Sequence, residues 1–354
     1  MTDTIVLSID GMGGDHAPDI VVEGVDIAAK RRSDTRFIIH GEAARIQALL
    51  ARYPAAKAVT SVAPAEKTIG MEVKASQALR QGKGSSLWNA IESVEKGQAN
   101  AVVSAGNTGA FMAISLFRFR AMEGVHRPAL TTRWPSIKGG YTVILDVGAN
   151  VEADNEQLVE FAIMGEAFAR AVSGIARPSV GLLNVGSEEQ KGHEEIRGAA
   201  ALIREAGFDM DFRGFVEGDD IAKGAVDVVV TDGFTGNIAL KTGEGTARLV
   251  AHYLREALSG SILGKLGALI AYPALRKLRE RMDPGSFNGA VFLGLNGLAV
   301  KSHGSANGHG FAAAIDVASL LARSHYREEI ANNLSRLAAA EAAAASAAQV
   351  GEAG

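Results

Sequence analysis

A short apolar run, a glycine-rich loop and an amphipathic stretch follow one another repeatedly along this chain. The first copy has an apolar run at residues 5–9, the loop Asp10-Gly11-Met12-Gly13-Gly14-Asp15 and an amphipathic stretch from Pro18 to Lys30. The run predicts a strand and the stretch a helix, with Pro18 suited to the first turn. The same order recurs at residues 101–109, 143–150, 180–187 and 226–237. Continuous apolar strands that alternate with helices are typical of a parallel sheet covered on both faces, so an α/β fold is expected.

The glycines of this pattern lie where a ligand is expected. Of 354 residues, 41 are glycine, against a usual share of about 7%. In parallel α/β sheets ligands bind beyond the carboxyl ends of the strands, and these loops follow the strands directly. We therefore expect the loops to gather at one edge of the sheet.

Other segments depart from the pattern. Residues 64–86 are polar and predict a long surface loop. Residues 129–134 and 141–145 predict a hairpin, and residues 289–301 predict two short strands around Asn296-Gly297. We expect one large α/β catalytic domain over residues 1–337 with a helical protrusion at about 245–285. The alanine-rich residues 338–354 are expected to form a tail, either the fraying end of a helix or a disordered segment.

Composition excludes several classes of function. Lys plus Arg number 36 and Asp plus Glu 40, a net charge of −4, so nucleic acid is not an expected partner. The chain has no cysteine, which excludes disulfides, thiolate metal sites and a cysteine nucleophile. No basic segment precedes the first apolar run, and no run reaches the ~18–20 residues that span a bilayer. A cytoplasmic protein is therefore expected.

Common cofactor motifs are absent or incomplete. Neither Gly82-Lys83 nor Gly264-Lys265 completes a P-loop, and the first glycine loop is not a full GxGxxG pattern. No histidines have the HExxH spacing, and the scattered aspartates suit caps and turns as well as magnesium. No cofactor and no metal are predicted.

What remains is a set of loops suited to anions. Backbone N–H groups at a helix N-terminus attract phosphate, and glycine lets the ligand approach closely; each loop could equally be a tight turn. Lys191 could neutralise a phosphate or simply pair with Glu188 or Glu194. Asn237 could donate to an oxyanion or only cap a helix.

Six sequence motifs, in order, resemble those of the PlsX family of bacterial phosphate acyltransferases. They are residues 10–18, 104–110, 145–150, 215–220 and 232–242, and Gly294-Leu295-Asn296-Gly297 taken with Lys301-Ser302-His303-Gly304-Ser305. The resemblance covers residues 5 to about 324. It implies a Rossmann-like α/β/α fold similar to phosphotransacetylases and to isocitrate and isopropylmalate dehydrogenases.

The resemblance also implies the activity: formation of acyl-phosphate from acyl-acyl carrier protein and inorganic phosphate, for phospholipid synthesis. A homodimer is implied, with a membrane glycerol-3-phosphate acyltransferase using the product. Lys191 and Asn237 are the predicted catalytic residues, because phosphate must be neutralised and the tetrahedral oxyanion needs a donor. The predicted substrate-binding residues are Gly13, Gly14, Asp15, His16, Asn107, Thr108, Gly109, Gly186, Ser187, His303 and Ser305.

Two other functions stay open on the sequence. The first is a related enzyme, either a phosphotransacetylase that uses acyl-CoA or a dehydrogenase relative. Coenzyme A and acyl carrier protein share the phosphopantetheine arm, so sequence separates them poorly. The second is a non-catalytic scaffold that binds carrier protein at the membrane.

The protrusion predicts a reversible contact with an anionic membrane surface. Apolar residues recur there at helical spacing, and Pro273 is expected to kink or divide the helix before a basic segment. This apolar tip is equally suited to a dimer or core helix. The predicted membrane contacts are Leu263, Leu266, Leu269 and Ile270, and the basic residues are Lys265, Arg276, Lys277, Arg279 and Arg281.

Overall fold

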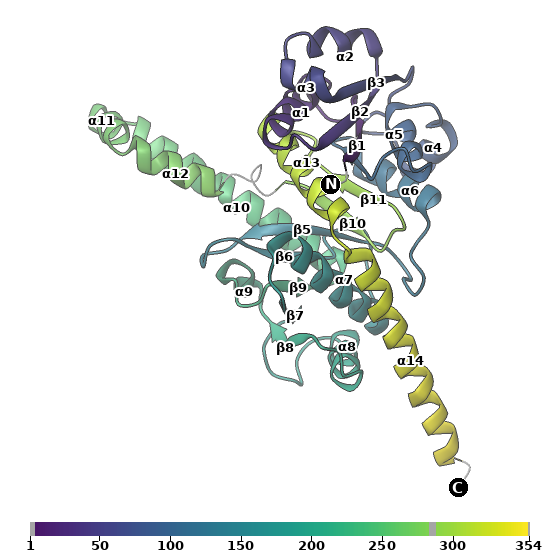
Figure 1. The fold of residues 1–354 in the computed structure, drawn as a ribbon. Helices are drawn as coiled ribbons and strands as arrows, with labels where there is room; N and C mark the ends of the chain where they lie inside the picture. Colours follow the sequence, from purple (N-terminus) through teal and green to yellow (C-terminus); the bar gives the residue numbers. More distant parts are fainter. Residues whose placement is uncertain (1–3, 283–287, 353–354) are drawn as a thin grey trace.

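One mixed sheet of eleven strands runs through the molecule (Figure 1). The structure, a computed structural model, describes residues 4–282 and 288–352. Across the sheet the strands are β3 (Thr60–Pro64), β2 (Thr35–Gly41), β1 (Ile5–Asp10), β4 (Ala101–Ser104), β11 (Leu298–Lys301), β10 (Ala290–Leu293), β5 (Ala129–Pro135), β6 (Tyr141–Leu145), β9 (Val228–Val230), β7 (Ser179–Leu183) and β8 (Asp211–Val216).

The sheet consists of two parallel halves that run in opposite directions. Strands β3, β2, β1, β4 and β11, the first half, are parallel to one another, as are β6, β9, β7 and β8, the second half. Between the halves, the pairings β11–β10, β10–β5 and β5–β6 are antiparallel. Three reversals leave the second half antiparallel to the first. The predicted hairpin at 129–145 and the two strands around Asn296-Gly297 are confirmed.

Helices cover both faces of the sheet (Figure 1). They are α1 (Asp19–Arg31), α2 (Ala43–Leu50), α3 (Pro54–Val59), α4 (Ala75–Gln81), α5 (Ser86–Glu95), α6 (Thr108–Phe119), α7 (Asn155–Ser173), α8 (Glu194–Glu205), α9 (Gly218–Lys223), α10 (Gly233–Ser259), α11 (Ile262–Ile270), α12 (Tyr272–Met282), α13 (Gly308–Arg323) and α14 (Tyr326–Glu352).

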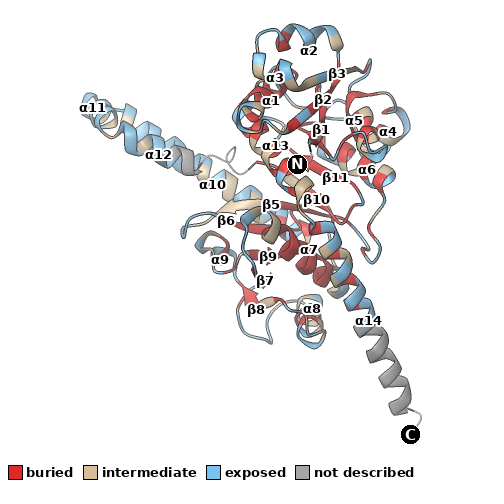
Figure 2. Cartoon of the chain, viewed as in Figure 1, coloured by how far each residue is buried: buried red, intermediate tan, exposed pale blue. Residues whose placement is uncertain are grey.

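The hydrophobic core has two layers because strand side chains alternate between the faces. In β6, Val143 and Leu145 join one buried cluster while Ile144 joins the other. The first layer contains most of α7 and α13, and the second contains much of α5 and α6. Figure 2 shows this buried centre in red. The expected α/β/α architecture is confirmed.

An arm of three helices leaves the body (Figure 1). It consists of α10, α11 and α12, and Figure 2 shows it almost wholly exposed. Helix α11 ends at Ile270 and α12 begins at Tyr272, so the helix is divided next to Pro273 as expected. Residues 283–285 of the predicted protrusion, and the side chains of Arg279 and Arg281, lie outside the part that is described.

One local expectation needs amendment. The segment 64–86 is not one loop, because α4 forms within it and packs against α6. At the other end of the chain, α14 continues from Tyr326 to Glu352 and enters the segment predicted to fray; its alanines favour helix even without packing.

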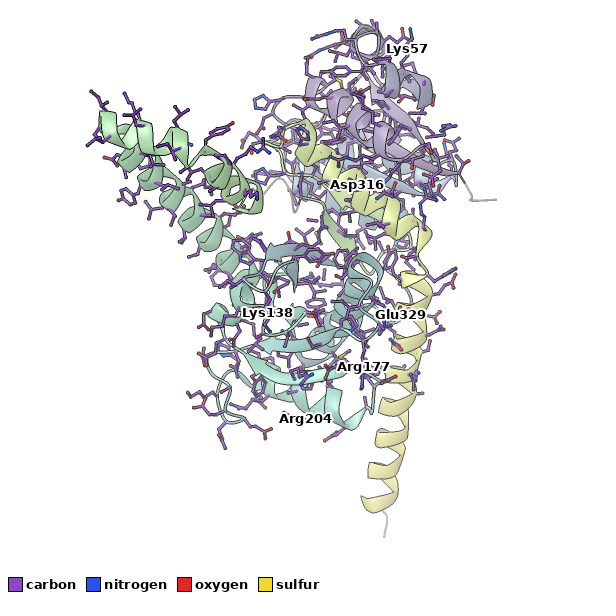
Figure 3. The ribbon with its side chains drawn as sticks, turned by 60° about the vertical axis from the view of Figure 1, so that its left-hand side comes forward. Lys57, Lys138, Arg177, Arg204, Asp316 and Glu329 are labelled. Atoms are coloured by element: carbon purple, nitrogen blue, oxygen red, sulfur yellow. The ribbon has the colours of Figure 1, made fainter. Side chains whose placement is uncertain are left out.

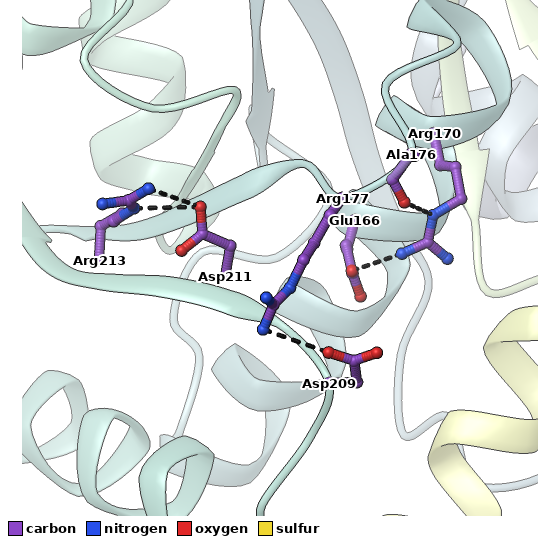
Figure 4. Close-up of polar contacts among 7 residues, drawn as sticks. All are labelled: Glu166, Arg170, Ala176, Arg177, Asp209, Asp211 and Arg213. Atoms are coloured by element: carbon purple, nitrogen blue, oxygen red, sulfur yellow. Dashed lines mark hydrogen bonds and ion pairs between the residues drawn. The ribbon is translucent and has the colours of Figure 1, made fainter.

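Ion pairs join neighbouring elements away from the glycine loops. Asp316 of α13 accepts from Arg32 at 2.7 Å and from Arg31 at 3.0 Å, and Glu329 of α14 pairs with Arg170 of α7 (Figure 3). At the amino ends of β7 and β8, Arg177 pairs with Asp209 and Arg213 with Asp211, and Arg170 also pairs with Glu166 (Figure 4). The pairs at β7 and β8 lie at the opposite ends of these strands from the glycine loops.

Candidate active site

Three glycine loops of the first half meet at the carboxyl ends of β1, β4 and β11. The Asp15 N–H donates to the Gly304 carbonyl oxygen at 2.9 Å. Gly13 is packed so closely that a Cβ there would lie 2.7 Å from the Gly106 nitrogen. Gly14 has φ +105°, which other residues rarely adopt. The structure therefore brings together the predicted residues Gly13, Gly14, Asp15 and the loop of His303 to Ser305.

Asn107 is a positioning residue in this structure. Its Oδ1 accepts from Ala110 N at 2.9 Å and caps α6, while its Nδ2 donates to the carbonyls of Met71 and Val73 at 2.6 and 2.8 Å. Both ends of the amide are thus engaged with protein, and substrate binding by Asn107 stays a prediction. Thr108 and Gly109, the first residues of α6, remain exposed at the site.

His303 and Ser305 form a local pair on the third loop. The His303 Nδ1 lies 2.9 Å from Ser305 Oγ and accepts from the Ser305 N–H at 3.3 Å. Desolvation lowers the pKa of His303 below its usual value, so the neutral ring is favoured. A neutral ring whose Nδ1 accepts carries its proton on Nε2. His16 and Asp15 are exposed on the first loop.

In the second half, Asp146 organises the loop after β6. Its buried carboxylate accepts from the backbone N–H groups of residues 130, 148, 149 and 150 at 2.6–3.1 Å. Such hydrogen bonds favour the charged form, but desolvation outweighs them and raises the pKa of Asp146. The aspartate is therefore a structural element of the loop.

Asn237 lies in the second turn of α10, beside this loop. Asp232 caps the helix by accepting from Thr235 N at 2.7 Å, so the alternative that Asn237 is the cap is wrong. The Asn237 Nδ2 donates to the Val147 carbonyl at 3.2 Å. An amide nitrogen carries two protons, and one remains for a substrate oxygen. Phe234 and Ile238 flank Asn237 on α10 and are 61% and 49% exposed.

Lys191 lies on the exposed loop after β7. Its Nζ pairs with Glu188 at 2.9 Å, and a Cβ on Gly186 would collide with the Lys191 side chain. The hydrogen bond to Glu188 raises the pKa of Lys191 above its usual value, so the amine is charged. Pairing with Glu188 is therefore what the structure shows. Among the described contacts none joins Lys191 to Asn237.

The expectation that all glycine loops share one edge is wrong. Because the halves are antiparallel, the carboxyl ends of β1 and β4 lie at the opposite edge from those of β6, β9 and β7. Helix α10 links the two groups: it begins after β9, and its Gly243 packs against Trp134 near the far end of β5. Lys241 and Glu244, close by on α10, are near enough to His303 to influence its pKa.

Two residues that were named only within sequence motifs, and given no site role there, lie beneath the first-half loops. Lys301 is 7% exposed and Asp10 1% exposed. Both stand at the carboxyl end of a strand, next to a glycine loop. This position is the sequence signal that could have identified them. In residues 4–282 and 288–352 no group of three or more His, Asp or Glu could hold a metal ion. None of the helices in these ranges is long and apolar enough to cross a membrane.

The mixed sheet and its glycine loops place the chain in a class of α/β proteins, and several solved structures have a similar fold. The phosphotransacetylase EutD from Staphylococcus aureus has a TM-score of 0.58 at 16% identity, covering 90% of this chain and 94% of its own. The structure of "a putative 4-hydroxythreonine-4-phosphate dehydrogenase" from Salmonella typhimurium gives a TM-score of 0.53 at 15% identity, covering 91% of this chain and 100% of its own. At such identities the likeness concerns the fold, which is that of phosphotransacetylases and related dehydrogenases.

Comparison of sequences finds relatives with much higher identity than these solved structures. A family model described as "Fatty acid synthesis protein" matches residues 5–329. A phosphate acyltransferase from Caulobacter vibrioides is 57% identical over 97% of this chain and 95% of its own length. Another, from Paramagnetospirillum magneticum, is 51% identical over 96% and 97%. The chain belongs to the phosphate acyltransferase family, as its resemblance to PlsX proteins predicted, and is an acyltransferase.

Proposed function

We propose that this chain forms acyl-phosphate from acyl-acyl carrier protein and inorganic phosphate. The observation that carries the proposal is the convergence of three glycine loops, each followed by a helix, in a chain whose relatives are named phosphate acyltransferase. Backbone N–H groups at such places bind anions, and glycine permits close approach. Phosphate is the acceptor suited to these loops.

The proposed reaction is a direct transfer. A phosphate oxygen attacks the thioester carbonyl carbon, the C–O bond forms, and a tetrahedral oxyanion develops. The C–S bond then breaks, and the leaving sulfur takes the proton that phosphate gives up. No covalent acyl-enzyme is required, which is consistent with a chain that lacks cysteine.

Asn237 is the proposed donor to the oxyanion, because its second amide proton is free for that contact. The exposed apolar side chains of Phe234 and Ile238 beside it suit an acyl chain. Lys191, on the loop after β7, is the residue proposed to neutralise phosphate. Its described contacts are with its own loop, so this role requires the Lys191 side chain to leave Glu188 and approach the bound phosphate. Its exposed pair with Glu188 is worth little in water, so phosphate can replace the carboxylate at small cost.

A second part of the proposal concerns the arm. All five large apolar residues of α11 are exposed, from 53% for Leu266 to 83% for Ile270. Each basic residue near an anionic surface adds ~1 kcal/mol, and Lys265 lies among them. We propose that the protein is cytoplasmic and binds the membrane reversibly through this tip. A membrane glycerol-3-phosphate acyltransferase is the proposed consumer of the product, in phospholipid synthesis.

The identity of the acyl donor tests the proposal. Purified protein is given palmitoyl-acyl carrier protein or palmitoyl-CoA at equal concentration, with inorganic phosphate and no nicotinamide. The proposal predicts faster acyl-phosphate formation from the carrier-protein substrate. Turnover with acyl-CoA alone would make the chain a phosphotransacetylase, and binding of carrier protein without turnover would make it a scaffold.

A further inference from the structure

Lys301 is a buried cation that joins two of the glycine loops. It is the last residue of β11, and its Nζ donates to the Ala105 carbonyl at 3.3 Å and to the Ser302 carbonyl. Ala105 begins the loop after β4, and Ser302 begins the loop after β11. One ammonium group therefore holds the starting points of both loops.

Asp10, the last residue of β1, contacts the third loop, which follows β1, and is also linked to the loop after β4. Its Oδ2 accepts from Ser104 Oγ at 2.7 Å, and Ser104 Oγ in turn accepts from Gly106 N at 3.0 Å. The other oxygen accepts from Met12 N at 3.3 Å, at the start of the loop after β1. Gly13 lies directly against this carboxylate.

The charges around Lys301 come from several elements. Asp10 of β1 and Asp15 of the first loop favour the ammonium form, while Lys241 of α10 opposes it. His303, on the loop that follows Lys301, is kept neutral by desolvation. Burial is the largest influence and lowers the pKa of Lys301 to about 8. The amine therefore loses its proton much nearer to neutral pH than an exposed lysine.

We propose that Lys301 is a positioning residue of the phosphate site, whose ammonium, together with Asp10, holds the three glycine loops in the geometry that binds inorganic phosphate. Lys301 acts through the loops, since its observed hydrogen bonds go to their carbonyls. The inference rests on the proposed function only for the identity of the anion.

The expected consequence is a weaker phosphate site when the ammonium is lost. A hydrogen bond from a charged group is worth about 1.5–3 kcal/mol, equivalent to at least about tenfold in affinity. Above about pH 8 the wild-type protein should therefore bind phosphate progressively more weakly. Arginine remains charged at this pH, so the K301R variant should bind phosphate without this decline in affinity.

The test measures binding of inorganic phosphate by calorimetry from pH 7 to pH 9.5, together with steady-state kinetics. For K301M we expect about tenfold weaker phosphate binding and a raised KM for phosphate, with the KM for the acyl donor nearly unchanged. K301R is expected to restore phosphate binding and to remove its decline above about pH 8. The control is K57M, which removes an exposed lysine on α3 (Figure 3). Helix α3 directly precedes the amino end of β3, whereas the loops follow the carboxyl ends of the parallel strands.

Three results would overturn the inference: unchanged phosphate affinity in folded K301M, a decline above pH 8 that persists in K301R, or wild-type affinity that stays constant over the whole pH range. The last measurement needs no variant, so it decides the matter even if neither variant folds. If phosphate binds as described but no acyl-phosphate forms, the proposed function fails while the role of Lys301 stands.

Discussion

At the scale of single residues, the polar side chains of the loops divide into two kinds. The side-chain oxygens of Asp146, Asn107 and Asp10 accept hydrogen bonds from backbone N–H groups or neighbouring side chains. These bonds give the loops their shape. Asn237 and Lys191 are exposed and keep donors for a ligand. Sequence motifs alone could not separate the two kinds, because each contains an asparagine that directly follows a glycine, Asn107 in the first and Asn237 in the second.

Asn237→Ala separates catalysis from stability. Loss of one oxyanion donor typically costs ~10²–10³ in turnover, so we expect kcat to fall at least about tenfold while Tm stays close to wild type. Asp232→Ala, which removes the observed cap of α10, should instead cost about 1 kcal/mol of stability. Kinetics and thermal unfolding of both variants check this. A lower Tm with full kcat in Asn237→Ala would remove the residue from the mechanism.

At the scale of elements, the order of strands and helices along the chain was predictable from the sequence. The relative direction of the strands in the sheet was not. The apolar runs and glycine loops indicated β1, β4, β6, β7 and β9 because local pattern determines them. The reversal between the halves depends on the pairing of β10 with β5, strands more than 150 residues apart. The role of Lys301 was missed for a similar reason: Asp10 at the end of β1 and Ala105 directly after β4 are far from Lys301 in sequence.

Helix α11 tests the predicted membrane contact. The double variant Leu266→Glu, Leu269→Glu places two charges in the exposed apolar tip, and we expect it to abolish salt-sensitive binding to anionic vesicles. Vesicle co-sedimentation at low and high salt measures the effect. The matched control is Ile137→Glu at the β5–β6 turn, also highly exposed at 84%, which should bind like wild type.

Continued binding by the double variant would refute the membrane contact. Unfolding of that variant, or its conversion from dimer to monomer, would favour the alternative that α11 is a packing helix.

At the scale of the whole molecule, the arm leaves apolar surface that a single chain does not cover. Leu249, Val250, Tyr253 and Leu254 of α10 are 38–59% exposed at helical spacing. Surfaces of this kind mark interaction sites, and the resemblance to PlsX proteins implies a homodimer. We propose that α10 packs against a second copy of this chain.

Sedimentation velocity tests this assembly. Wild-type protein should sediment with the mass of two chains, and Leu249→Glu with Tyr253→Glu should sediment as one, because charge is costly in an apolar interface. Ala251→Glu, on the other side of the same exposed helix, should leave the dimer intact. A wild-type protein that sediments as one chain at micromolar concentration contradicts the proposed assembly.

The most direct test of the proposed function is the stoichiometry of one reaction. Palmitoyl-acyl carrier protein is mixed with the protein, with and without inorganic phosphate, and carrier-protein thiol and acyl-phosphate are both measured. We predict one acyl-phosphate for each thiol released, and no release above background without phosphate. Thiol release that is independent of phosphate, or that yields free fatty acid, would contradict direct transfer to phosphate.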